Sequence, residues 1–88
     1  MDPAGEPTRS LDSLPEGAAA MVADVTVPQD DAARQLVLRL LELGFVPGER
    51  VTVVRASRAA MEPLAVRVGH STFALRRQEA AFILVRTA

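Results

Sequence analysis

The fold is decided by the stretch Arg39-Leu40-Leu41-Glu42-Leu43-Gly44-Phe45-Val46-Pro47-Gly48-Glu49. Its first half continues a helix, and Gly44 is the expected stop, because glycine adopts the left-handed conformation at little cost. Phe45 is expected to fold back onto the last helical turn. Pro47 and Gly48 then suit the second and third positions of a type II turn. The stretch therefore predicts a helix that ends at Leu43 and a β segment that begins directly after the turn.

Upstream, the sequence predicts that this helix begins at Asp30 or Asp31, because either carboxylate can accept the free N–H groups of a first turn. The apolar residues that follow have the spacing of one helical face: Ala33, Leu36, Val37, Leu40 and Leu41. Before the helix, residues 18–27 end in β-branched residues and are followed by Pro28, which favours a strand.

The N-terminal part is expected to divide in two. Residues 1–9 contain two Pro and one Gly without periodicity, which indicates a disordered tail. Leu11 and Leu14 begin a short lead-in, residues 10–17, and are spaced to cover one face of a turn. The folded domain is therefore expected to comprise residues 10–88.

Downstream of the type II turn, the hydrophobic period changes from helical to alternating. Strands are predicted at residues 50–55, 63–68, 71–75 and 82–86. Gly69 and His70 suit a two-residue type II′ hairpin, and residues 76–81 suit a single 3₁₀-like turn. Short strands of this kind can close into a bent barrel. The predicted fold is mainly β, a small SH3-like β-barrel of about five strands with one inserted α-helix and a short 3₁₀ turn before the last strand.

Composition excludes several classes of protein. The absence of Cys excludes disulfides and thiolate sites and favours a reducing, cytoplasmic setting. The polar N-terminus does not resemble a signal peptide, and the longest apolar run is too short for a membrane helix. The charge is uneven, because residues 1–49 carry 3 Arg against 9 acids and residues 50–88 carry 7 Arg against 2 acids. This asymmetry either forms a basic surface for a partner or is neutralised within the fold.

The sequence offers little for catalysis or metal binding. His70 is the only histidine, and its expected place at a hairpin tip leaves it without a buried acid to orient it. Motifs for zinc proteases, P-loops and dinucleotide folds are missing. The pair Asp30-Asp31 is explained by helix capping. We therefore expect no enzyme, no cofactor, no catalytic residue and no metal-ligating residue, although direct binding or sensing of a transition metal stays open as an alternative.

Two kinds of binding surface remain. Arg55, Arg58, Arg67, Arg76 and Arg77 could form a basic face for nucleic acid, but all three Phe are expected in the core, which leaves no platform for base stacking. Leu38 and Leu43 flank the helix stripe, and Met61 lies in the loop 56–62, so these residues suit either a protein partner or the core.

Four motifs resemble the ferrous iron transport protein A (FeoA) family. They are Leu11-x-x-Leu14-x-x-Gly17; Arg39-Leu40-x-x-Leu43-Gly44-Phe45-x-Pro47-Gly48-x-x-Val51; Pro63-Leu64-x-Val66-x-Val68-Gly69; and Leu75-Arg76-x-x-Glu79-Ala80-x-x-Ile83-x-Val85. They occur in family order over about residues 10–86. One departure is Met61-Glu62-Pro63, where the family commonly has Gly-Asp-Pro. The same fold also occurs as the C-terminal domain of iron-dependent repressors, whose preceding domains we do not expect here.

The resemblance implies an SH3-like barrel and a small cytosolic accessory protein of bacterial ferrous iron uptake. It implies as partner the cytosolic part of FeoB, a membrane Fe(II) transporter with a G-domain. We expect the contact to involve the exposed edge of the helix and the loop 56–62, with Leu38, Glu42, Arg58, Met61 and Glu62 as partner-binding residues. Nucleic acid and direct membrane insertion are not expected.

Overall fold

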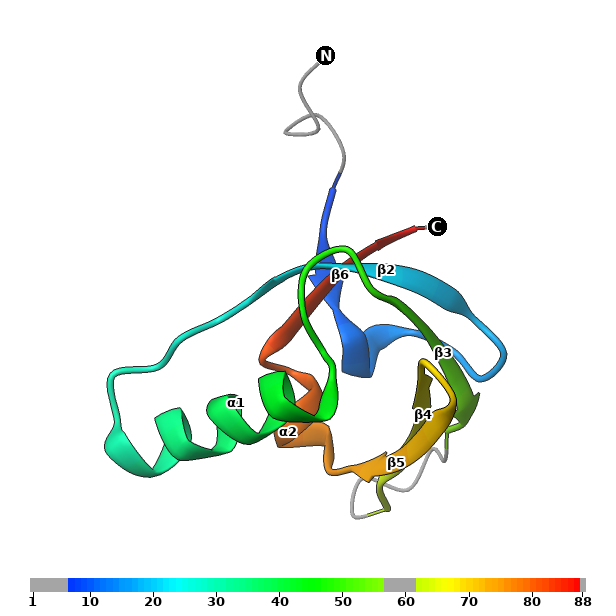
Figure 1. Ribbon diagram of the computed structural model, residues 1–88. Helices are drawn as coiled ribbons and strands as arrows, with labels where there is room; N and C mark the ends of the chain where they lie inside the picture. Colours follow the sequence, from blue (N-terminus) through cyan, green and yellow to red (C-terminus); the bar gives the residue numbers. More distant parts are fainter. Residues whose placement is uncertain (1–6, 57–61, 88) are drawn as a thin grey trace.

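The computed structural model describes residues 7–56 and 62–87, which form a strongly curved antiparallel sheet with one long helix beside it (Figure 1). The elements in chain order are β1 (Arg9–Ser10), the 3₁₀ turn η2 (Leu11–Ser13), β2 (Ala19–Val25), α1 (Asp31–Leu43), β3 (Arg50–Arg55), β4 (Leu64–Val68), β5 (Ser71–Leu75), α2 (Arg77–Ala80) and β6 (Ile83–Thr87). The mainly β fold and the inserted helix are confirmed.

The strands form one sheet in the order β1-β6-β2-β3-β4-β5. Register shifts interrupt the pairing of β2 with β6 near Ala23 and of β3 with β4 near Val54, and such irregularities bend and twist a sheet. The sheet curls in this way into a barrel-like shape (Figure 1). It does not close, however, because β1 and β5 stand at its two ends and are not paired with each other among the described residues.

Three details differ from the sequence expectation. Arg9 is already part of β1, where it pairs with Val85, so the ordered chain includes a residue that we assigned to the tail. With this two-residue strand β1 the sheet has six strands, where about five were expected. The turn before the last strand is one turn of α-helix instead of 3₁₀-helix, because the N–H of Ala80 bonds to the carbonyl of Arg76, four residues earlier.

The predicted helix ends are confirmed. Asp30 caps the start of α1, with its Oδ2 accepting the N–H of Ala33 at 2.9 Å. At the other end Gly44 has φ +115°, the N–H of Gly44 bonds to Leu41 and that of Phe45 to Leu40, both at 3.1 Å. These two bonds form a Schellman motif, which fixes the direction in which the chain leaves the helix.

The core is entirely apolar among the described residues and lies between the curved sheet, η2 and the C-terminal half of α1. Its buried members are Leu11, Ala20, Val22, Val25, Val37, Leu40, Phe45, Val51, Val53, Leu64, Val66, Val68, Leu75, Ala80, Ile83 and Val85. Phe45 is the largest of them and is fully buried, as its position after the helix stop predicts. The first buried residue of α1 is Val37, so the N-terminal half of the helix projects beyond the sheet (Figure 1).

Candidate binding groove between α1 and the edge strand β5

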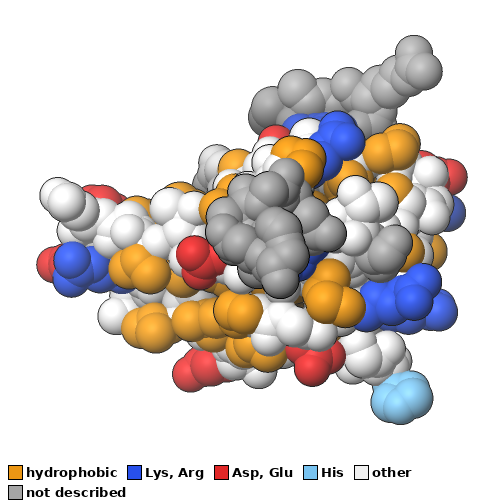
Figure 2. Space-filling model, turned by 90° about the horizontal axis from the view of Figure 1, so that it is seen from above, with side chains coloured by type: hydrophobic (Ala, Val, Ile, Leu, Met, Phe, Trp, Pro, Cys, Tyr) orange, Lys and Arg blue, Asp and Glu red, His pale blue; other side chains and the backbone are white. Residues whose placement is uncertain are grey.

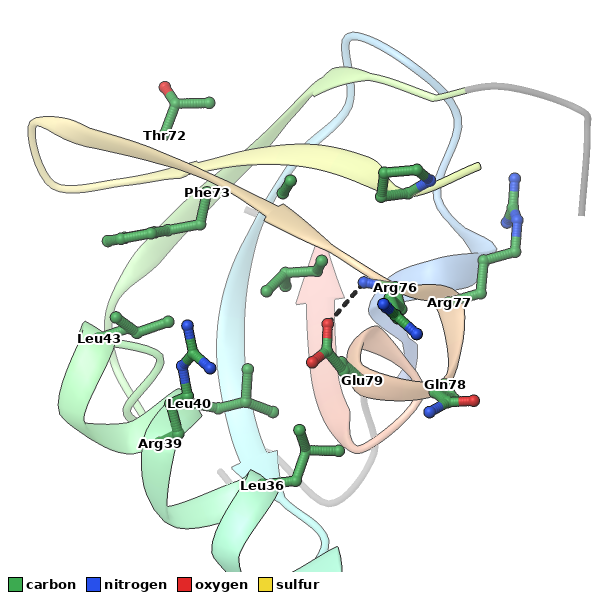
Figure 3. A pocket seen from close by; sticks show the side chains of 13 residues that line it. Leu36, Arg39, Leu40, Leu43, Thr72, Phe73, Arg76, Arg77, Gln78 and Glu79 are labelled. Atoms are coloured by element: carbon green, nitrogen blue, oxygen red, sulfur yellow. Dashed lines mark hydrogen bonds between the residues drawn. The ribbon is translucent and has the colours of Figure 1, made fainter. Parts of the chain in front are cut away.

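The described residues form a groove of about 1130 Å³ between α1, β5 and α2. Leu36, Leu40 and Leu43 line it from the helix, and Phe73 lines it from the strand (Figure 3). At the C-terminal end of β5, the groove is bounded by Arg76 and the residues of α2. Its volume slightly exceeds the range of about 300–1,000 Å³ that is typical of small-molecule pockets, which suits a segment of a larger partner.

The groove lies between the helix α1 and the sheet edge β5, which both line it above the same core. Val37 and Leu40 point into the core, whereas Leu36 and Leu43 are only half-buried on the side of α1 that faces β5. Phe73 is also half-buried and contacts the buried Phe45 edge-to-face, with ring centroids 6.1 Å apart. The apolar lining is therefore held in place by the core beneath it.

Arginines surround the apolar lining. Arg39 points from α1 into the opening, and Arg76 stands at the end of β5 (Figure 3). The acidic residue of the lining is Glu79, whose Oε1 accepts the backbone N–H of Arg76 at 2.6 Å and so caps α2. Arg77 is half-buried and donates from Nη1 to the carbonyl oxygen of Asp12 at 3.3 Å, which ties α2 to η2. The groove is thus apolar at its base and cationic at its rim.

The residues expected to bind a partner lie partly elsewhere. Leu38 and Glu42 are exposed on α1, one turn apart, and neither lines the groove. Leu38 has 51% of its surface exposed. Figure 2 shows hydrophobic side chains in a row on the side of the molecule where α1 projects. Glu62 is exposed two residues before β4, while Arg58 and Met61 lie outside the described residues.

The groove was not predicted from the sequence. Leu36 was expected in the buried helix stripe and Phe73 in the core, but both are half-buried at the groove. Leu43, for which the sequence allows either the core or a partner surface, packs partly on the core and also lines the groove. Arg39 was not among the expected partner-binding residues, and it lies at the rim of the groove. The sequence signal that could have indicated the groove is Arg39 among the leucines of the helix, since a charged residue there marks one flank of the helix as exposed.

The residues of the alternative interpretations lie on several elements of the fold. Arg55 and Arg67 lie on β3 and β4, Arg76 follows β5, and Arg77 bonds to Asp12. Phe45 is buried and Phe73 and Phe82 are half-buried, so no fully exposed aromatic platform is present. His70 projects from the tip of the β4–β5 hairpin (Figure 2). Within residues 7–56 and 62–87, no three His, Cys, Asp or Glu side chains gather as a metal site would need. No helix among these residues is long and apolar enough to cross a membrane.

The family comparison and the comparison with solved structures point to the same family. The FeoA domain family matches residues 9–87 of the chain. Among solved structures, the zinc-complexed FeoA of Stenotrophomonas maltophilia is 41% identical with a TM-score of 0.75, covering 86% of this chain and 87% of its own. That protein is described as an SH3 domain protein suggested to activate bacterial ferrous iron transport. A search of curated proteins finds no match.

Two further structures extend the comparison. An iron uptake regulatory protein, also an FeoA, is 25% identical with a TM-score of 0.72 and covers 91% of this chain and 96% of its own. A manganese-dependent transcriptional repressor has a TM-score of 0.78 but 23% identity, and it covers 94% of this chain and 43% of its own. The likeness to the repressor shows the shared fold alone.

Proposed function

Because the chain belongs to the FeoA domain family, which is associated with ferrous iron transport, we propose that it is a cytoplasmic accessory protein of ferrous iron uptake. In this proposal it binds the cytosolic part of a FeoB-type transporter and changes the activity or the assembly of that transporter. It acts by binding and not as an enzyme. The groove between α1 and β5 is the observation that carries the proposal.

The chemistry of the groove supports binding over catalysis. Its side chains are mainly aliphatic, aromatic and guanidinium groups. An arginine stays protonated at neutral pH and cannot act as a general base. Glu79 is already engaged in capping α2, and His70 lies at the tip of the hairpin. An apolar base with a charged rim is the usual arrangement of a protein-binding site.

The proposed interface has two parts on one helix. The groove side of α1 presents Arg39 with Leu36 and Leu43, and the outward side presents Leu38 and Glu42. The loop residues Arg58, Met61 and Glu62 remain part of the proposed surface. Because Leu38 and Arg39 are both exposed and adjacent, they allow the two sides to be tested separately with little effect on the fold.

The test is calorimetric titration of the protein with the purified cytosolic fragment of FeoB, repeated with Arg39→Glu and Leu38→Glu. We expect Arg39→Glu to weaken binding by roughly tenfold or more, because it reverses a charge at the groove rim. Leu38→Glu should also weaken binding, because it places a charge on the exposed apolar residue of the outward side. Gln35→Glu, on an exposed part of the same helix, serves as the control with an added negative charge. Absence of binding at high protein concentration would contradict the proposal.

A further inference from the structure

We propose that the groove recognises its partner by strand addition: an extended segment with alternating aliphatic and acidic residues pairs with the free edge of β5. This inference rests on the proposed function for the identity of the partner and adds the form in which the partner binds. Recognition of this kind takes affinity from main-chain hydrogen bonds and specificity from the pockets that receive alternate side chains.

The free edge of β5 follows from the topology. β5 stands at the end of the sheet and pairs only with β4 among the described residues, from Leu64–Leu75 to Val68–Ser71. An edge strand presents a row of unpaired N–H and C=O groups, and natural proteins usually shield such rows. Here α1 lies across the groove from this edge, so the space beside it is bounded but not filled.

The hairpin determines which groups of β5 point outward. Its loop is Gly69-His70, and in a two-residue hairpin the flanking residues Val68 and Ser71 form a hydrogen-bonded pair. Hydrogen-bonded and non-hydrogen-bonded pairs alternate along an antiparallel ladder. The N–H groups of Phe73 and Leu75 therefore bond to β4, while those of Thr72 and Ala74 point away from it. The described residues supply no other backbone partner for Thr72 or Ala74.

The unpaired groups favour a strand over a helix as the occupant. A partner that fills the groove removes Thr72 and Ala74 from water, and leaving their backbone groups unpaired would be costly. A helix has already used its own backbone groups and cannot supply these bonds. An added antiparallel strand can exchange both bonds with each of the two residues.

The side chains of the groove define the composition of the segment. Residues of an added strand alternate between two faces, so every second side chain points toward Phe73 and the leucines of α1. These inward positions call for aliphatic residues. Arg39 and Arg76 at the rim are exposed, and Glu79 already caps α2, so the remaining positions favour acidic residues (Figure 3).

The experiment measures amide hydrogen exchange of the ¹⁵N-labelled protein by NMR. The first probe is an acetylated and amidated heptapeptide in which three Val or Leu alternate with four Asp or Glu. At saturation we expect exchange at Thr72 and Ala74 to slow by roughly tenfold or more, because the added strand bonds both amides. The Phe73 amide, already paired with β4, should change little and serves as the internal reference.

Two matched controls separate strand pairing from side-chain contact. The same peptide with N-methyl groups on alternate amides of one edge keeps every side chain but cannot form the ladder, and it should fail to bind. In the protein, Ala74→Pro removes one outward N–H, at an edge position where proline is tolerated. The variant should bind the heptapeptide with roughly tenfold lower affinity. If this variant does not fold, Thr72 and Ala74 exchange in the unaltered protein still decides the question.

The cytosolic fragment of FeoB is the second probe, and its result separates the two proposals. Fragment binding with slowed exchange at Thr72 and Ala74 supports both. Fragment binding with unchanged exchange at these amides overturns strand addition and leaves the proposed function standing. Slowed exchange with the heptapeptide but no fragment binding supports strand addition and contradicts the FeoB partnership. Binding of neither probe overturns both, and protection that appears with dimerisation of the protein alone shows a second copy as the occupant.

Discussion

At the scale of single residues, Gly44 shows how one position joins the helix to the sheet. Its φ of +115° lies where side chains with a Cβ atom are strained, and its turn directs Phe45 into the core. The space around it is not the constraint, because an added Cβ would lie 3.8 Å from the nearest Val68 methyl group, an ordinary contact. The requirement for glycine is therefore one of backbone conformation.

We accordingly expect Gly44→Ala to lower the free energy of unfolding by about 1–2 kcal/mol, the cost of holding a non-glycine residue in a left-handed conformation. Urea unfolding followed by circular dichroism would measure it. Gly44→Asn is the matched control, since asparagine tolerates this conformation better and should lose less. Equal stability of Gly44→Ala and the unaltered protein would show that the chain leaves the helix by another route.

At the scale of elements, sequence reasoning worked where the cause is local. The Asp30 cap, the Gly44 stop, the Gly48 turn with φ +94° and the Gly69 hairpin with φ +61° all follow from short-range chemistry, and the structure has each of them. The lining of the groove could not be predicted in the same way. Alternation identifies the two faces of β5, but it does not tell whether the strand has a neighbour on each side.

The helix α1 shows the same division between local and tertiary causes. Its apolar stripe was predicted, yet only Val37 and Leu40 are fully buried, because the sheet reaches only the C-terminal half of the helix. Leu36 and Leu43 therefore face the groove instead of the core. How much of an apolar stripe is buried depends on how far the sheet extends along the helix, and the periodicity of the helix sequence carries no information on that.

Because the first half of α1 projects beyond the sheet, its cap should matter locally. We expect Asp30→Ala to cost about 1 kcal/mol, since the carboxylate no longer accepts the N–H of Ala33. The loss should appear mainly as faster amide exchange in the first two turns, before Val37. Asp31→Ala, at the first helical residue, is the control and should have a smaller effect. Uniformly faster exchange through the whole helix would contradict this local role of the cap.

At the scale of the whole molecule, the first and last strands of the fold, β1 and β6, lie side by side at one end of the sheet. β1 pairs with β6, and the following turn η2 places Leu11 in the core with none of its surface exposed. Arg77 of α2 reaches back to the carbonyl oxygen of Asp12. The lead-in and the C-terminal elements therefore depend on each other, although 65 residues separate Asp12 from Arg77 in sequence.

This dependence makes Leu11 a test of the integrity of the whole fold. A buried Leu→Ala substitution costs about 2–5 kcal/mol, through lost burial and the cavity left behind. A domain of this size has a total stability of only about 4–13 kcal/mol, at roughly 0.05–0.15 kcal/mol per residue. Leu11→Ala should thus remove a large fraction of the stability and unfold β6 and α2 together with the lead-in. Thermal unfolding measures the loss, and Leu14→Ala, at a half-buried position in the same segment, should lose clearly less. If Leu11→Ala instead frees only residues before β2 while β6 stays protected from exchange, the lead-in is an appendage and not part of the core.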